Sequence, residues 1–203
     1  MIVWFDMDGV TCDFDGEYMR LTGRPTWYGD HQKSHDEKWD MIMKHPNFFR
    51  DLPWMKGARA LFNFVRYSRV ATPGILSAAS SHIEKSDEHK RIWLDNELPE
   101  LMWTPDLVKI VAHKKEKAQY AKTGDILIDD FEANIKAWRE AGGIGILFKS
   151  AAQAISELQE YMKTDEKFFK LALACAENDV TSSVYFEMYM LEQNERLAQN
   201  RNS

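Results

Sequence analysis

Five short segments of mostly apolar residues, spaced along the chain, most constrain its fold. They cover residues 2–5, 70–76, 107–111, 125–128 and 144–148. Strands with continuous rather than alternating apolar residues are typical of a parallel sheet that helices cover on both faces. Helical patterns at 83–96 and 132–141 lie between these segments. We therefore expect an α/β fold built on a parallel five-stranded sheet.

Two parts of the chain lie outside this alternation. Residues 15–67 are rich in aromatic residues and are broken by glycine and proline into short helical pieces. We expect them to form a small helical cap inserted after the first strand, so that residues 1–14 and 68–150 form the core. Residues 151–203 show only helical patterns. We expect a helical C-terminal extension whose apolar faces pack on the core or form a homodimer with a second copy.

The charge balance argues against one class of partner. The chain has 203 residues, with 26 Lys and Arg against 32 Asp and Glu, and a net charge of −6. Such an acidic chain is not expected to bind nucleic acid electrostatically. No apolar run is long enough to cross a membrane, and the first residues lack the features of a signal peptide. With only Cys12 and Cys175 as cysteines, we expect a cytoplasmic protein with reduced thiols.

Polar residues stand where four of the expected strands end. They are Asp6 and Asp8 after the first strand, Ser77 after the second, the basic cluster 113–117 after the third, and Asp129 with Asp130 after the fourth. Ligands of open parallel sheets bind beyond the carboxyl ends of the strands, so we expect these side chains to converge. Carboxylates that lie close together raise one another's pKa unless a cation lies between them, and Mg²⁺ prefers such ligands. The pattern predicts a Mg²⁺ site at which a phosphate group can also bind.

The residue types at this edge predict phosphoryl-transfer chemistry. Asp6 is the expected nucleophile, because a carboxylate can form an acyl phosphate that water later cleaves. Asp8 is the expected general acid/base. Gly9 lets the backbone approach the phosphoryl group closely, while Ser77 and the backbone amides from Ala78 onwards would donate hydrogen bonds to it. A lysine of the basic cluster would offset the charge of nucleophile and phosphate.

Three motifs resemble those of the haloacid dehalogenase-like (HAD-like) phosphohydrolases. Phe-Asp-Met-Asp-Gly-Val-Thr at 5–11 resembles their first motif, Ser77 their second and Asp129-Asp130 their fourth. Within that superfamily the chain is most similar to the 5′(3′)-deoxyribonucleotidases, on the basis of Asp13-Phe14, Asn47-Phe48-Phe49 and Leu127 to Asp130. The resemblance covers roughly residues 1–148 and implies a Rossmann-like core.

This resemblance implies a Mg²⁺-dependent phosphatase for nucleoside monophosphates, with Asp6 as nucleophile and Asp8 as general acid/base. The implied metal ligands are Asp6, the backbone carbonyl of Asp8, Asp129 and Asp130, the last directly or through water. Lys117 best matches the lysine of the third motif, and Lys115 is the alternative.

The resemblance also implies an aromatic pocket for the nucleotide. Phe14 and Phe49 match family positions that line this pocket, and Trp27 or Tyr28 is expected to add a further wall. The small residues that follow Ser77 replace a hydroxyl and a lysine that animal members place around the phosphate, which leaves the substrate preference open. The helical tail has no counterpart in those enzymes.

Other functions remain open from the residues alone. The same chemistry could serve a polynucleotide 3′-phosphatase or a sugar phosphatase, and a strand-sized channel would favour the polynucleotide. A phosphoryl-accepting receiver domain also combines acids, a hydroxyl and a lysine, but its acceptor aspartate follows the third strand. A catalytically silent binding protein would be expected to lack Asp6 or Asp8, and both are present.

Overall fold

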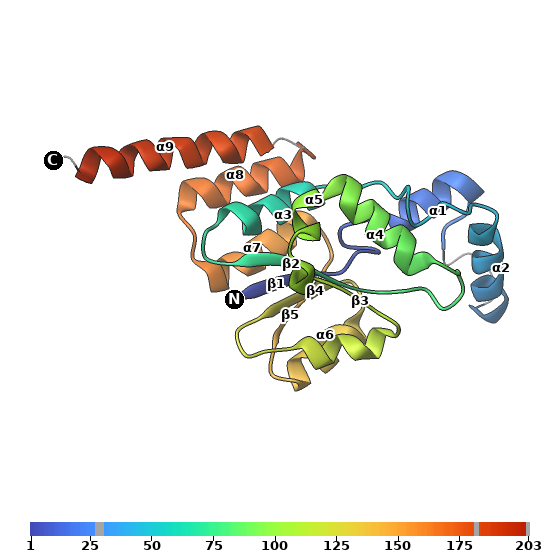
Figure 1. Ribbon diagram of the computed structural model, residues 1–203. Helices are drawn as coiled ribbons and strands as arrows, with labels where there is room; N and C mark the ends of the chain where they lie inside the picture. Colours follow the sequence, from blue (N-terminus) through green and yellow to red (C-terminus); the bar gives the residue numbers. More distant parts are fainter. Residues whose placement is uncertain (27–30, 181–182, 202–203) are drawn as a thin grey trace.

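A single parallel sheet forms the centre of the protein (Figure 1). The structure, a computed structural model, describes residues 1–26, 31–180 and 183–201. The strands, all parallel, are β1 (Ile2–Phe5), β2 (Thr72–Ala78), β3 (Val108–Val111), β4 (Ile126–Asp129) and β5 (Ile144–Leu147). Their order in the sheet is β3-β2-β1-β4-β5. The expected α/β fold with a five-stranded parallel sheet is confirmed.

Strand β1 lies between β2 and β4, so its carboxyl end opens at the middle of the sheet edge. Phe5 pairs with Ile75 of β2 and with Ile128 of β4. The backbone N–H of Asp6 donates to the carbonyl oxygen of Ile128 at 3.0 Å, which continues the pairing one residue beyond the strand. This register places Asp6 beside Asp129, the residue that follows Ile128.

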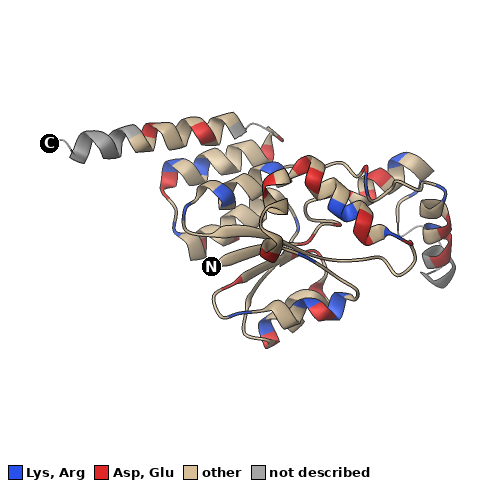
Figure 2. Cartoon of the chain, in the orientation of Figure 1, with Lys and Arg blue, Asp and Glu red and all other residues tan. Residues whose placement is uncertain are grey.

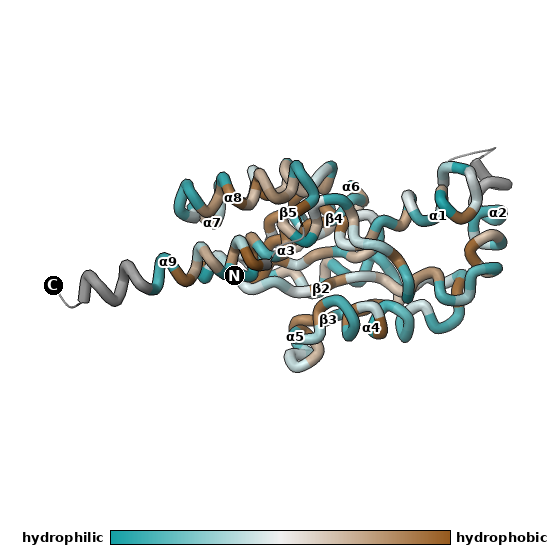
Figure 3. The backbone as a smooth tube through the Cα atoms, turned by 90° about the horizontal axis from the view of Figure 1, so that it is seen from above, coloured by the Kyte–Doolittle hydropathy of each residue, from teal (hydrophilic) through white to brown (hydrophobic). Residues whose placement is uncertain are grey.

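Helices cover both faces of the sheet, as the continuous apolar strands predict. Val3 and Phe5 point into the larger core, which includes residues of α3 (Ala58–Tyr67) and α4 (Ser86–Glu97). Trp4 points to the opposite face and joins a smaller cluster with α6 (Glu132–Glu140). Figure 3 shows the hydrophobic strands lying between more hydrophilic helices.

The bounds of β2 and of the helix after it differ from those expected. The second strand begins at Thr72 rather than at 70, because residues 68–71 form a turn in which Ser68 Oγ accepts from the amides of Val70 and Ala71. It ends at Ala78 rather than at 76, so Ser77 lies within β2, where it pairs with Ile110. The following helix begins at Ser86, after Lys85, whose φ of 64° interrupts helical geometry.

The segment after β1 projects from one end of the sheet. It contains α1 (Phe14–Thr22) and α2 (His31–Met43), which lie beyond α4 in Figure 1. Helix α3, which we expected within the cap, instead contacts β2 and the C-terminal helices. The division into core and cap stays a prediction, and these contacts favour a cap that ends before α3.

The C-terminal helices pack on α3, on the larger-core side of the sheet. They are α7 (Ala151–Met162), α8 (Glu166–Glu177) and α9 (Ser183–Arg201). Phe64 of α3 stacks on Phe168 at 5.4 Å between ring centroids, and Tyr67 stacks on Phe186 at 5.9 Å. Figures 1 and 3 both show α9 at the opposite end of the molecule from α1 and α2.

Short helices complete the connections: α5 (Pro99–Met102), and the 3-10 helices η1 (Pro105–Leu107) and η2 (Lys114–Tyr120). In Figure 2, basic and acidic residues are interspersed along the same helices of the described chain. Among the described helices, none has the length and apolar character needed to span a membrane.

Candidate active site

A tight turn after β1 places the first two acids of the site. The amides of Val10, Thr11 and Cys12 all donate to the carbonyl oxygen of Met7, which closes the chain on itself. Gly9 has a φ of +80°, a conformation that residues with a side chain rarely adopt. A Cβ at this position would lie 2.3 Å from Asp130 Oδ2. The turn therefore requires glycine both for its conformation and for the close approach of β1 to the β4 end.

A buried lysine joins the acids that follow β1 and β4. Lys117 of η2 is 1% exposed, and its Nζ lies 2.8 Å from Asp6 Oδ2 and 2.7 Å from Asp129 Oδ2. Asp6 Oδ1 accepts from the amide of Met7 at 2.7 Å. Lys115, two residues before Lys117, is exposed. The structure therefore favours Lys117 over Lys115 as the lysine of this site.

Asp129 is held by residues that follow β4 in sequence. Its Oδ1 accepts from the amide of Phe131 at 2.8 Å, and Asn134 Nδ2 lies within 3.0 Å of both carboxylate oxygens. Asn134, on the first turns of α6, is 6% exposed. We did not predict Asn134 from the sequence. Its position five residues after Asp129, on the inner face of a helix that starts at the site, is the signal that could have identified it.

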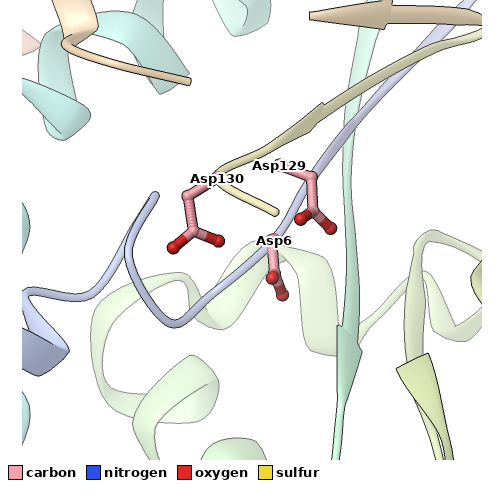
Figure 4. Close-up of side chains that lie close together, drawn as sticks. All are labelled: Asp6, Asp129 and Asp130. Atoms are coloured by element: carbon pink, nitrogen blue, oxygen red, sulfur yellow. The ribbon is translucent and has the colours of Figure 1, made fainter. Parts of the chain in front are cut away.

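Three carboxylates lie close enough to share a cation. Asp6, Asp129 and Asp130 each offer an oxygen, and these oxygens lie within 4.8 Å of one another (Figure 4). Burial, Asp6 and Asp129 together raise the pKa of Asp130 to about 7. Burial is the largest cause of this rise, and the repulsion from the two neighbouring carboxylates adds to it. An all-oxygen donor set of this kind fits a hard divalent cation such as Mg²⁺.

Asp8 lies on the other side of the turn, next to a second buried lysine. Lys90 of α4 is fully buried, and its Nζ lies 2.8 Å from Asp8 Oδ2 and 2.9 Å from Ser77 Oγ. We did not predict Lys90, because its sequence position within an otherwise polar helix resembles that of a solvated lysine. Its spacing of three residues before Trp93, which is buried, is the available signal.

The two aspartates of the turn have opposite pKa shifts. Burial raises the pKa of Asp6, but Lys117 and Lys90 outweigh burial and hold this pKa below its usual value. Burial likewise raises the pKa of Asp8, and here Lys90 does not fully offset burial and the charge of Asp6, so the pKa stays above its usual value. Such divergent shifts in one pair of carboxyl groups are typical of a nucleophile and a proton donor.

A cavity of about 660 Å³ opens above these acids. Its lining includes Asp6, Asp8, Gly9, Ser77, Ala78 and Lys117 from the predicted site. Phe14 also lines it, and so does Trp39 of α2, which we had not assigned to the site. Trp39 stacks on His82 of the loop after β2, with 4.7 Å between ring centroids and 12° between planes. The cap and the core thus meet over the cavity.

One of the predicted aromatic residues, Phe49, does not line the cavity. Phe49 is 1% exposed and packs against Phe14 and Phe48 rather than lining the cavity. Its burial follows from its place in the segment between α2 and α3, which packs into the larger core. Trp27 and the alternative Tyr28 lie outside the described residues.

The sheet order and the site define a class of protein. The strand that precedes Asp6 is central and first in the chain, and the order β3-β2-β1-β4-β5 differs from the 2-1-3-4-5 order of receiver-type folds. An aspartate pair after β1, a hydroxyl in β2, and a lysine that meets the acids after β4 are arranged as in a HAD-like phosphohydrolase.

The comparison with family models gives the family. Residues 1–165 match the family described as "5′ nucleotidase, deoxy (Pyrimidine), cytosolic type C protein". The chain belongs to this family of HAD-like 5′(3′)-deoxyribonucleotidases and is a phosphohydrolase of the nucleotidase type. The match extends beyond the expected limit at residue 148 and includes α7. Among curated proteins no match was found.

Proposed function

We propose that this enzyme hydrolyses (deoxy)nucleoside monophosphates with Mg²⁺ and an aspartyl-phosphate intermediate on Asp6. The observation that carries this proposal is the convergence of Asp6, Asp8, Lys117 and Asp130 at one cavity, with the buried Asp129 held against Lys117. The family description names deoxy pyrimidine nucleotides, which makes deoxyuridine and deoxythymidine monophosphates the first substrates to examine.

The proposed reaction has two steps. A carboxylate oxygen of Asp6 attacks phosphorus, the bond to the leaving oxygen breaks, and Asp8 gives that oxygen its proton. Water then attacks the phosphorus of the aspartyl phosphate, gives a proton to Asp8 and releases phosphate and free Asp6. The lowered pKa of Asp6 keeps the nucleophile ionised, and the raised pKa of Asp8 favours its protonated form.

The proposed cation ligands are Asp6, Asp129, Asp130 and the backbone carbonyl of Asp8. The three aspartates are supported as ligands because their carboxylate oxygens lie within 4.8 Å of one another. When bound, Mg²⁺ supplies positive charge for the carboxylates and for the phosphoryl oxygens. Lys117 contributes a further positive charge beside Asp6, so that an anionic substrate can approach an anionic nucleophile.

The cavity supports a small substrate with an aromatic base. Phe14 and Trp39 present aromatic side chains to it, and stacking of a base on an aromatic ring contributes about 1–3 kcal/mol in proteins that bind single strands. The Trp39–His82 stack joins the cap to the core at this cavity. This contact favours a mononucleotide over a polynucleotide, which would need a groove open to a strand. A sugar phosphatase remains the alternative, because the same acids and lysine could act on the phosphate group of a sugar phosphate.

Phosphate release from nucleoside monophosphates tests the proposal. We expect release from deoxyuridine and deoxythymidine monophosphates in the presence of Mg²⁺, and loss of activity on chelation. Asp6→Asn should abolish turnover, while the surface change Asp51→Asn, in an exposed pair with Arg50, should not. Turnover by Asp6→Asn would contradict the mechanism, and a preference for sugar phosphates over every nucleotide would favour the alternative.

We also propose a cytosolic location, in keeping with the family description, and a homodimer through the C-terminal helices. In support of the dimer, Val184, Met188 and Leu191 are 56%, 55% and 62% exposed along α9. Helix α9 lies at the opposite end of the molecule from the cap, so that pairing there would leave the cavity open (Figure 1). Light scattering should give twice the chain mass, and Leu191→Glu should return the monomer. A monomeric parent protein would contradict the dimer.

A further inference from the structure

Lys90 is a buried lysine whose three N–H donors are all engaged. Its Nζ lies 2.8 Å from Asp8 Oδ2, 2.9 Å from Ser77 Oγ and 2.9 Å from the carbonyl oxygen of Ala78. An ammonium group has three donors and no acceptor, so these contacts leave none for a phosphate oxygen. Lys90 is therefore placed to orient protein groups rather than to bind substrate.

The contact with Asp8 makes the two oxygens of that carboxyl group different. Oδ2 accepts from Lys90, whereas Oδ1 is buried and has no hydrogen-bond partner among the described residues. A proton that passes to a leaving oxygen must sit on an oxygen that is not already held by a cation. Oδ1 is therefore the oxygen of Asp8 that can carry the proton to the leaving oxygen.

The contact with Ser77 fixes the direction of a hydroxyl in the same way. Because Ser77 Oγ accepts from Lys90, its own proton points away from Lys90. The ring of Phe49 lies over the other side of the ammonium, with 5.3 Å between Nζ and the ring centroid. Phe49, which we expected in the substrate pocket, thus closes the environment of Lys90 instead.

We propose that Lys90 is a positioning residue of the hydrolysis: it orients Asp8 for proton delivery to the leaving oxygen and Ser77 for contact with the phosphoryl group. This role rests on the proposed function, and it acts through Asp8 and Ser77 rather than on the substrate. A lysine that only anchors α4 to β2 would make the same contacts, so the test must separate proton delivery from stability.

Two substrates with different leaving groups separate these roles. A nucleoside monophosphate releases an alkoxide, which needs a proton, whereas p-nitrophenyl phosphate releases a stable phenolate, which hardly needs one. General acid catalysis contributes about 100- to 10,000-fold. We expect Lys90→Met to lower kcat/KM for deoxyuridine monophosphate by at least about 100-fold, and for p-nitrophenyl phosphate by less than about 10-fold. Equal losses on both substrates, or no loss, would overturn the proposal.

Matched variants make the comparison specific. Arg91→Met removes a positive charge from the next, exposed position of α4 and should change neither rate. Asp8→Asn should show the same dependence on the leaving group. Adding Lys90→Met to Asp8→Asn should cost less than about 10-fold more on deoxyuridine monophosphate, which is the part that acts through Ser77. A further loss of about 100-fold or more in the double variant would show that the proton-delivery effect of Lys90 does not act through Asp8 and would overturn the proposal.

Two further results, a variant that does not fold and an inactive parent enzyme, also bear on the role of Lys90. If Lys90→Met does not fold, Lys90→Arg retains the charge but displaces the donors. It should show the same leaving-group dependence, and equal losses on both substrates would overturn the role. If the parent enzyme releases phosphate from neither substrate, the proposed function itself is overturned, and this role with it. Activity on both substrates with equal losses in the variants overturns only the role of Lys90.

Discussion

Replacing Lys117 by methionine should destabilise the protein more than any other single change at the site. Lys117 is 1% exposed and lies within 2.8 Å of carboxylate oxygens on Asp6 and Asp129. Methionine has a similar length but leaves both buried carboxylates without a compensating charge. Desolvation keeps the pKa of Asp129 above its usual value even with Lys117 present, which shows how unfavourable charge is there.

The expected magnitude follows from this burial. Removing one partner of a buried ion pair costs about 3–5 kcal/mol, because the remaining charge is left uncompensated. For a chain of this size, a loss of 1 kcal/mol lowers Tm by about 2–4 °C. We therefore expect Tm to fall by roughly 6–20 °C in the absence of divalent cations.

Thermal unfolding with and without Mg²⁺ is the measurement. If Asp6, Asp129 and Asp130 bind the cation, Mg²⁺ should raise Tm more in Lys117→Met than in the parent protein, because the cation then replaces the missing charge. Lys115→Met, at an exposed position of the same short helix, is the control and should stay within about 0.5 kcal/mol of the parent. If Lys117→Met lowers Tm by less than about 2 °C, the reasoning is refuted.

Two further predictions concern stability. Gly57 has a φ of +73°, and a Cβ there would lie 2.6 Å from the carbonyl oxygen of Ala176, so Gly57→Ala should cost more than the 1–2 kcal/mol or so of backbone strain alone. Gly124→Ala, at φ +88° with nothing within 4 Å, measures that strain alone; equal losses in urea unfolding would contradict the contact. Asp165 caps α8 through the amides of Lys167 and Phe168, so Asp165→Ala should cost about 1 kcal/mol at neutral pH. A hydrogen bond from Tyr189 lowers the pKa of Asp165, so its contribution is full above the unfolded value of 3.8 and is lost as the pH falls through the lower folded value. A cost that persists unchanged at pH 2 would contradict this assignment.

The sheet could be predicted from the sequence because its signals are local. Each strand is a short, mostly apolar run, and burial on both faces follows from the lack of alternation. The association of α3 with the C-terminal helices could not be predicted in this way. Phe64 and Tyr67 meet Phe168 and Phe186 across more than a hundred residues of sequence, and an amphipathic helix does not indicate which surface will cover it.

The site residues also differ in whether the sequence could predict them. Asp6 and Asp8 follow β1 and Asp129 ends β4, so the sheet topology brings them to one edge. Lys90 and Asn134 lie on helices, where the angle of the helix to the sheet decides whether a side chain reaches the acids. Trp39 lines the cavity because of the way the cap folds. The same fold buries Phe49 away from the cavity. The acids at the strand ends could therefore be predicted from the sequence, whereas Lys90 and Asn134 could not.

The arrangement of charge at the site explains why the carboxyl groups of Asp6 and Asp8 have opposite pKa shifts. Each is paired with its own buried lysine: Asp6 with Lys117, which it shares with Asp129, and Asp8 with Lys90, which Asp8 shares with the neutral Ser77. Asp6 gains from both lysines and its pKa is lowered, whereas Asp8 also experiences the negative charge of Asp6 and its pKa is raised. The difference thus arises from the neighbours of the two carboxyl groups, since both belong to one tight turn.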